Sequence, residues 1–219
     1  QDRSRYNLLV ASMKFDQNNL NNYMYPTSGT DCSVLGLLAY GKERFKPYNS
    51  NLQPHSKQTL SWLQIEGNTY FPLGNKFVLG VRGKAVVSSK GLLSNYTSTL
   101  IQAPAFTPTP HSKTIFNPAF RSTQYLAAGV IPIWKIMNNL QFRNEFYVFA
   151  PFRQIYEGEN MVPYYGKAFT KYHFMGESSL VLDLSFASIS LYANYYDYPA
   201  RNWNFGINIG LLVFSPKFL

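Results

Sequence analysis

The alternation of apolar with small or polar residues near the C-terminus constrains the fold of this chain more than any other feature. From Trp203 to Phe214 an apolar side chain falls at every second position, and most positions between are asparagine or glycine. A period of two is typical of a β-strand with one apolar face. Eleven steps of about 3.3 Å give about 36 Å. A tilt of about 45° reduces this to about 25 Å, the height of an outer-membrane apolar band, whereas ordinary strands are roughly half as long.

The same alternation recurs upstream, and charged residues fall on only one of the two faces. Gln141, Arg143 and Glu145 share one parity, and leucine, phenylalanine and valine occupy most positions of the other. Segments 76–88 and 177–195 follow a similar rule. A filled apolar core does not tolerate several strands that each hide charged residues. The pattern therefore favours a polar lumen and an apolar outer face that meets lipid.

Composition excludes several other classes of protein. Charged residues make up only 14% of the 219 residues, against roughly 25% in average soluble domains. No apolar run approaches the roughly 20 residues of a transmembrane helix. The net charge is +9, but the basic residues are scattered singly, which argues against a nucleic-acid partner.

Cys32 is the one cysteine of the sequence, so no intrachain disulfide is expected. Gln1 replaces an initiator Met, which indicates a mature or truncated chain.

Nine strands are predicted, and the connections between them differ in length. The connections 71–75 and 137–139 and the bend at Ala187 are short, whereas 46–57, 90–121 and 152–169 are long. Outer-membrane barrels have short periplasmic turns and longer external loops, so the C-terminus is expected on the periplasmic side. The predicted strands cover residues 5–17, 30–45, 58–70, 76–89, 122–136, 140–151, 170–186, 188–197 and 202–214.

Aromatic residues gather at both ends of the last predicted hairpin. Tyr195, Tyr196 and Trp203 lie at one boundary and Phe214 at the other. Aromatic girdles mark both membrane interfaces in such barrels, so these four residues are predicted to face lipid. An odd number of strands does not close a bacterial single-chain barrel. Either one strand is miscounted or the chain is part of a larger barrel.

Several short segments together resemble a known family. The strand and Pro-x-x-Gly turn over 20–29 resemble a periplasmic turn of the Omp85 (BamA-like, bacterial surface antigen) superfamily. More specifically, the chain is similar to the C-terminal barrel of Bacteroidetes patatin-like phospholipases. The segments that carry this resemblance are Tyr25-Pro-Thr-Ser-Gly-Thr30, Gly41-Lys-Glu43, Ala103-Pro-Ala-Phe-Thr-Pro108, Phe116-Asn-Pro-Ala-Phe-Arg121, Asn202-Trp-Asn-Phe-Gly206 and Pro216-Lys-Phe218.

The resemblance implies a fold and a function for the chain. In that family a patatin domain and a POTRA-type linker domain precede a sixteen-stranded transmembrane barrel. Residues 1–219 would then be the C-terminal nine strands of an all-β, antiparallel outer-membrane barrel, with a long inward-folding loop at about 90–121. The chain would anchor, or help to export, a patatin-type lipid hydrolase domain outside these residues. The implied partners are outer-membrane lipid, lipopolysaccharide, the barrel assembly machinery and, in a homodimer or larger membrane complex, other protein chains.

Arg121 is the residue that the resemblance singles out in the long loop. The family carries an Arg-Gly-aromatic motif there; this chain has Phe120-Arg121-Ser122, which keeps the arginine and lacks the glycine. The resemblance implies that Arg121 reaches the lumen and pairs with acidic groups, and Glu145 and Asp183 have lumen-facing parity. An exposed loop arginine is the alternative. Two of the basic residues near the loop, Arg82 and Lys84, could serve the lumen network or face lipopolysaccharide phosphates.

No catalytic, metal or cofactor site is predicted. The chain lacks the Gly-x-Ser-x-Gly elbow that a patatin serine requires. His55 and His111 lie in Pro-rich loops, where solvated positions are expected. Glu157 and Glu159 flank Gly158, and this pattern indicates a solvated loop.

Two alternatives remain open. The first is a complete small barrel acting as a pore, adhesin or component of a membrane protein complex, in which the strand around 8–15 would pair with the last strand. The second is a soluble lipid-binding β-barrel or sandwich, in which Trp203, Ile207 and Leu211 would point inward.

Overall fold

The main structural unit is one antiparallel sheet of nine strands in a computed structural model that describes residues 3–46, 58–184, 186–197 and 202–211. Strand order in the sheet follows the chain, with a separate two-stranded hairpin, β7–β8, inserted between β6 and β9. Each of the nine predicted strands corresponds to one strand of the sheet. The strands are β1 (Arg3–Asn18), β2 (Gly29–Lys46), β3 (Gln58–Pro72), β4 (Phe77–Ser88), β5 (Tyr125–Lys135), β6 (Leu140–Pro151), β7 (Arg153–Glu157), β8 (Pro163–Ala168), β9 (His173–Asp183), β10 (Ala187–Tyr196) and β11 (Trp203–Leu211).

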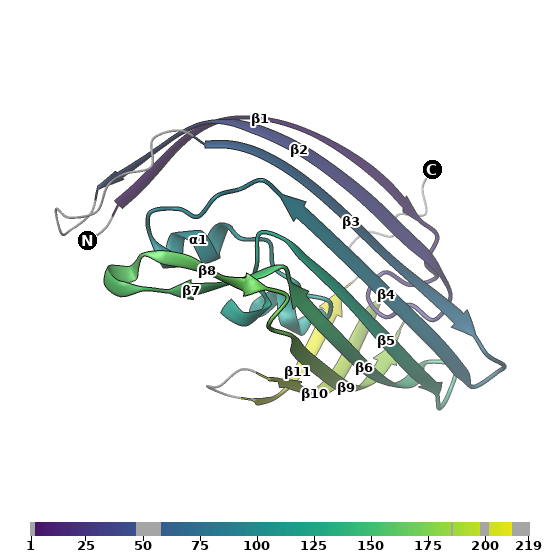
Figure 1. The fold of residues 1–219 in the computed structure, drawn as a ribbon. Helices are drawn as coiled ribbons and strands as arrows, with labels where there is room; N and C mark the ends of the chain where they lie inside the picture. The colour runs from purple at the N-terminus through teal and green to yellow at the C-terminus, as the bar shows by residue number, and fades with distance from the viewer. Residues whose placement is uncertain (1–2, 47–57, 185, 198–201, 212–219) are drawn as a thin grey trace.

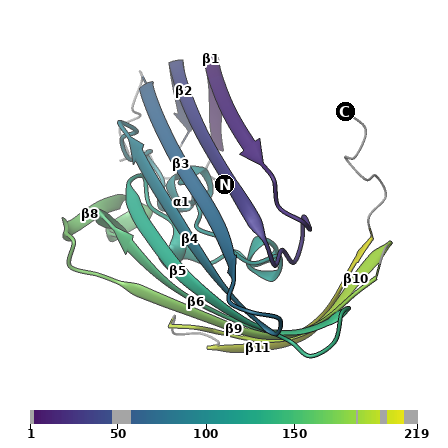
Figure 2. The ribbon, with the colours of Figure 1, turned by 90° about the vertical axis from the view of Figure 1, so that its right-hand side faces the viewer.

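The sheet curls strongly, and the long loop lies inside the curve (Figures 1 and 2). Within the described residues, β1 pairs only with β2 and β11 pairs only with β10, so these two strands are the edges of the sheet. The pairing of first and last strands that a complete small barrel requires is not found there. The all-β, antiparallel architecture predicted from the sequence is confirmed.

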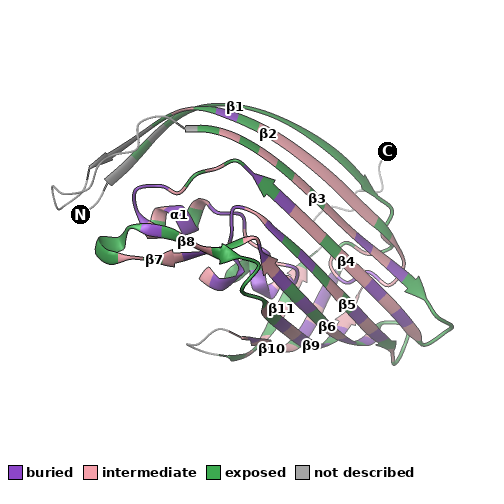
Figure 3. Ribbon diagram, viewed as in Figure 1, coloured by how far each residue is buried: buried purple, intermediate pink, exposed green. Residues whose placement is uncertain are grey.

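The two faces of the sheet differ in chemistry, as the alternating burial along the strands makes visible (Figure 3). In β11 the apolar residues Trp203, Phe205, Ile207, Ile209 and Leu211 are between 60% and 74% exposed. Their neighbours in sequence face the concave side, in register with the serines and asparagine of β10. A soluble sandwich would bury these apolar residues, so the prediction made from that alternative is wrong.

Inward-facing tyrosines lie across glycines on the neighbouring strand. Tyr147 of β6 is directly opposite Gly129 of β5, and a Cβ at Gly129 would overlap the tyrosine ring. Tyr192 of β10 and Gly206 of β11 repeat this arrangement. Glycine in a strand often marks such a close approach. Each pair lets a large ring lie flat along the concave face and leaves room for the inserted segments.

The connections at the two ends of the sheet differ in length. The turn segments 73–76, 136–139 and 184–186 are short, and the ten-residue turn 19–28 lies at the same end. At the other end, segment 89–124 contains a short helix, α1 (Tyr96–Gln102), and the 3-10 helices η1 (His111–Thr114) and η2 (Pro118–Phe120). The Asn95 side chain accepts a hydrogen bond from the Ser98 amide and so caps α1. The predicted connection 46–57 lies almost wholly outside the described residues.

The third long connection has regular structure that the sequence analysis did not predict. Residues 152–172 form the β7–β8 hairpin, with the 3-10 helix η3 (Glu159–Met161) at its tip. Glu157 and Glu159 are exposed at this tip, as predicted. The five-residue strand β7 was missed because so short a run shows no sustained alternation.

Candidate functional site

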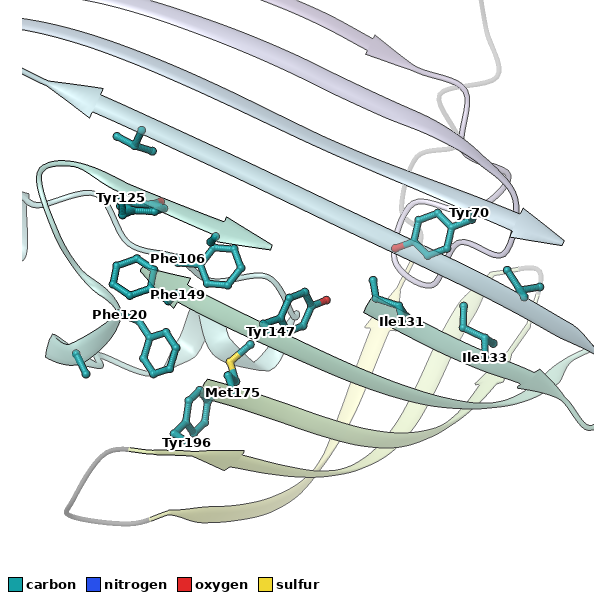
Figure 4. Close-up of a cluster of buried hydrophobic side chains, with 14 residues drawn as sticks. Tyr70, Phe106, Phe120, Tyr125, Ile131, Ile133, Tyr147, Phe149, Met175 and Tyr196 are labelled. Atoms are coloured by element: carbon teal, nitrogen blue, oxygen red, sulfur yellow. The ribbon is translucent and has the colours of Figure 1, made fainter. Parts of the chain in front are cut away.

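Segment 89–124 lies on the concave face and is held there by aromatic packing (Figure 4). Phe106 is 2% exposed, and its ring lies 5.7 Å from that of Tyr147 and 6.4 Å from that of Tyr125. Phe120 is 3% exposed and lies 5.6 Å from Phe149. Burial of each phenylalanine contributes roughly 1.5–3 kcal/mol. The sheet therefore encloses a compact aromatic core rather than an empty lumen over this stretch.

One charged cluster joins β3 and β4 to the inserted loop. Glu66 forms ion pairs with Arg82 and, at 3.2 Å, with Lys84. Arg82 also donates a hydrogen bond to the Pro108 carbonyl in the loop. Arg82 and Lys84 therefore belong to a polar network with Glu66, which is the first of the two roles that the sequence left open for them. The Arg82 guanidinium therefore links the sheet to the loop, because it contacts Glu66 on β3 and the Pro108 carbonyl in the loop.

A second charged cluster lies on β6 and is fully buried. Arg143 is 2% exposed and Glu145 is 4% exposed, with 3.3 Å between Arg143 Nε and Glu145 Oε1. The Tyr147 hydroxyl donates to the other Glu145 oxygen, and Arg143 donates to the Pro26 carbonyl at 2.9 Å. A buried ion pair is stable only when further hydrogen bonds satisfy both partners. Here Tyr147 and the turn 19–28 supply those bonds.

The turn 19–28 also folds onto the concave face, toward β9, β10 and β11. Tyr25 is 2% exposed, and its hydroxyl lies 2.7 Å from Ser190 Oγ and accepts from the Asn208 amide at 3.3 Å. Asn22 donates to Asp183 at 2.6 Å. Burial raises the pKa of the Tyr25 hydroxyl above its ordinary value.

His111, at the start of η1, contacts the sheet through a polar pair. His111 Nδ1 lies 3.0 Å from Glu177 Oε1, and the imidazole stacks on Tyr192 with ring centroids 3.4 Å apart. His111 is only 4% exposed, so its predicted solvated position is wrong. The Pro-rich context suggested a surface loop, but the aromatic core draws the segment inward. His55 lies outside the described residues.

Arg121 does not make the ion pair that the resemblance implied. Its guanidinium donates to the carbonyls of Leu100, Ile101 and Ala103 at 3.1–3.3 Å and lies 4.6 Å above the Phe116 ring. These carbonyls lie at the C-terminal end of α1, where carbonyl groups have few partners within the helix, and the Leu100 carbonyl also accepts from the Ala103 amide at 3.2 Å. Arg121 therefore closes the C-terminus of α1, and neither Glu145 nor Asp183 is its partner.

Glu145 and Asp183 both belong to polar networks with other partners. Glu145 is bound by Arg143 and Tyr147 on its own strand. Asp183 accepts from Asn22 and, at 2.6 Å, from Ser188. The predicted network residues thus fall into three separate groups on the concave side.

Two of the predicted girdle residues face outward. Trp203 is 60% exposed and lies 5.2 Å from the partly exposed Tyr195 ring. Tyr196 is 4% exposed and packs against Phe120, so its predicted lipid-facing position is wrong. Tyr196 shares the parity of Asn194, and that parity alone indicates an inward side chain. Phe214 lies outside the described residues.

The part of the chain with described coordinates offers no group of three or more His, Cys, Asp or Glu side chains arranged for a metal ion. None of its helices combines the length and apolar character needed to cross a membrane.

The inserted turn 19–28 and the buried His111 were the main features that sequence reasoning missed. Alternation identifies strands, but it carries no information on where connections fold.

Comparison with known proteins adds no relative: no family model, curated protein or solved structure matches this chain.

Proposed function

We propose that this chain is part of an outer-membrane β-barrel that anchors, or helps to export, a patatin-type lipid hydrolase domain outside these residues. One observation carries the membrane part of this proposal. The outward face of the sheet is apolar and exposed, while charged residues gather on the concave face. Alternation of apolar-out and polar-in residues is the signature of transmembrane barrels.

The orientation follows from the connection lengths. Strand β11 runs toward the end of the sheet that carries the short turns. Because short turns are periplasmic in such barrels, the C-terminus belongs on the periplasmic side. Segments 89–124 and 152–172 then belong to the external side. Outer-membrane lipid and lipopolysaccharide surround the apolar face, and the barrel assembly machinery inserts it.

The hydrolase part of the proposal rests on the sequence resemblance. The open edges of β1 and β11 are consistent with further strands supplied from outside these residues, because unpaired strand edges are costly in a bilayer. The denatured mass of the native protein, purified from outer membranes, tests this part. A mass well above 25.1 kDa supports it. A mass of 25.1 kDa overturns it and leaves a self-contained barrel, acting as a pore, adhesin or component of a membrane complex.

A pair of substitutions on adjacent residues tests the membrane part separately. Ile207 is 65% exposed on the outward face, and Asn208 faces inward in register with Ser190. Lysine on the lipid face near the bilayer midplane costs about 2–4 kcal/mol, whereas lumen positions tolerate charge. We expect Ile207→Lys to reduce insertion into lipid vesicles strongly and Asn208→Lys to reduce it less. Equal insertion of Ile207→Lys and the native protein would contradict a lipid-facing position.

A further inference from the structure

Two lysines lie opposite each other at the end of the sheet that carries the short turns. The Lys135 amide, at the end of β5, donates to the Lys76 carbonyl, just before β4, at 2.7 Å. Both lysines continue the parity of inward-facing positions, which Val78 and Ile133, each 0% exposed, occupy next to them. Opposite residues in an antiparallel pair have Cβ atoms about 4.5–5.5 Å apart, and like charges in such a pair repel. A negatively charged group between the two ammonium groups would relieve this repulsion.

Both lysines line a cleft of about 570 Å³ that lies between the turn 19–28 and the turn segments 73–76 and 136–139. The two turn segments add three amide side chains to its lining, those of Asn75, Asn138 and Asn139. These side chains form no hydrogen bond with the described part of the chain. Each amide group can donate two hydrogen bonds. The cleft therefore combines two cations with several free donors.

The cleft contains one carboxylate, that of Asp183, and this group is already engaged elsewhere. Its two oxygens accept from Asn22 and Ser188, each at 2.6 Å. Among the described residues, neither Lys76 nor Lys135 forms an ion pair with an acidic side chain. Two positive charges and one negative charge leave an excess of one positive charge in the lining. This excess favours an anionic ligand.

The geometry points to a binding site in this cleft for the phosphate group of a small soluble molecule, with Lys76 and Lys135 as its cationic contacts. A phosphate monoester carries a charge of about −1.5 to −2 at neutral pH and has three strong acceptor oxygens. Two ammonium groups match this charge, and the turn asparagines can donate to the remaining oxygens. Because both lysines continue the inward parity, a soluble phosphate fits the cleft better than a lipid headgroup on the outward face. The bound anion removes the repulsion between the lysines.

Thermal unfolding of the detergent-solubilised native protein, titrated with inorganic phosphate, tests this site. Sodium chloride at equal ionic strength is the reference, because salt alone screens the two lysines. A ligand that binds only the folded protein raises its unfolding temperature, so we expect an increase that follows a binding curve. Lys76→Gln and Lys135→Gln should each weaken phosphate binding by about tenfold, because hydrogen bonds to charged groups are the stronger ones. Without phosphate, both variants should unfold at the same temperature as the native protein or higher, because each removes the repulsion.

The matched control is Lys171→Gln, which removes an exposed lysine at the opposite end of the sheet. It should keep the native response and so corrects for the general stabilisation of folded proteins by phosphate. Equal responses to phosphate in the native protein, Lys76→Gln and Lys135→Gln would overturn the site. The same titration with phosphatidylglycerol in the micelles distinguishes a lipid headgroup. A lysine-dependent response to this lipid and none to inorganic phosphate would also overturn a site for soluble phosphate. Neither result depends on whether the proposed membrane location is correct.

Discussion

Two inserted segments lie on the concave face of the same sheet, and they are held by different interactions. The turn 19–28 enters from the end with short turns and is fixed by hydrogen bonds to Arg143, Ser190 and Asp183. The loop 89–124 enters from the opposite end and is fixed mainly by the packing of Phe106 and Phe120. One segment is positioned by directional polar contacts and the other by buried apolar area.

This difference shows two ways in which inserted segments can be held on the concave side of a sheet whose inner face is polar. Buried apolar area supplies the larger share of the free energy but is non-directional. Polar contacts in a low dielectric contribute less net free energy, yet the loss of one partner is costly. We therefore expect the position of the turn 19–28 to depend on individual hydrogen-bonding groups. The position of the loop 89–124 should depend on the volume of its buried side chains.

The largest effect is expected at Arg143, which links the turn to the sheet. Arg143→Met leaves Glu145 buried without its cation and removes the bond to the Pro26 carbonyl. Breaking a buried ion pair by removing one partner costs about 3–5 kcal/mol. Urea titration in lipid vesicles, followed by the fluorescence of the three tryptophans, measures this loss. Hydrogen exchange should increase over 19–28 more than over 96–121.

A double variant controls for the ion pair itself. Arg143→Met combined with Glu145→Leu removes both charges, and apolar replacement of a whole buried pair is often neutral. We expect it to recover more than half of the lost free energy. If the single variant loses under about 1 kcal/mol, Arg143 is exposed to solvent in the native protein and the contrast between the segments fails.

An effect of similar size is expected at Phe106 in the loop. Phe106→Ala removes a ring packed among Tyr125, Tyr147 and Phe149, and such truncations cost about 3–5 kcal/mol. Hydrogen exchange should now increase over 96–121 rather than over 19–28. Phe116→Ala is the matched control, because Phe116 lies in the same loop and is 51% exposed. Exchange that rises equally in both segments would show that they form one cooperative unit.

A smaller effect is expected from one hydroxyl of the turn. Tyr25→Phe keeps the ring and removes the contacts with Ser190 and Asn208. Two hydrogen bonds and an unmatched buried serine correspond to about 2 kcal/mol. Tyr23→Phe is the matched control, since Tyr23 is 77% exposed in the same turn. Equal urea midpoints for the two variants would contradict a fixed position for the Tyr25 hydroxyl.

The strands were predictable because alternation is a local property of the sequence. Nine segments with apolar residues at every second position became the nine strands of the sheet, and the parity of Arg143 and Glu145 gave their inward direction. Parity also indicates that Tyr196 faces inward, although its aromatic character suggested a lipid-facing girdle position. In such cases the alternation is the better guide, because one strand cannot present adjacent residues to the same face.

The inserted segments were less predictable because their positions depend on contacts distant in sequence. Tyr25 meets Ser190 and Asn208, and His111 meets Glu177. Nothing near Tyr25 or His111 in the sequence encodes these partners. The inward direction of Glu177 follows from parity, but its pairing with a histidine of the long loop does not.

The smallest effect is expected at Arg121, where the prediction from the sequence was wrong about the partner. Arg121→Met removes the hydrogen bonds to the last carbonyls of α1. Because the residue is partly exposed, water can replace these bonds, and the expected loss is about 1 kcal/mol. Hydrogen exchange should increase at 96–102 and remain unchanged at 19–28. Arg121→Lys should restore little, since an ammonium group lacks the fork that reaches several carbonyls at once. A loss of stability as large as that of Arg143→Met would instead indicate that Arg121 has a buried acidic partner. The loop would then also be held by polar contacts, and its contrast with the turn 19–28 would fail.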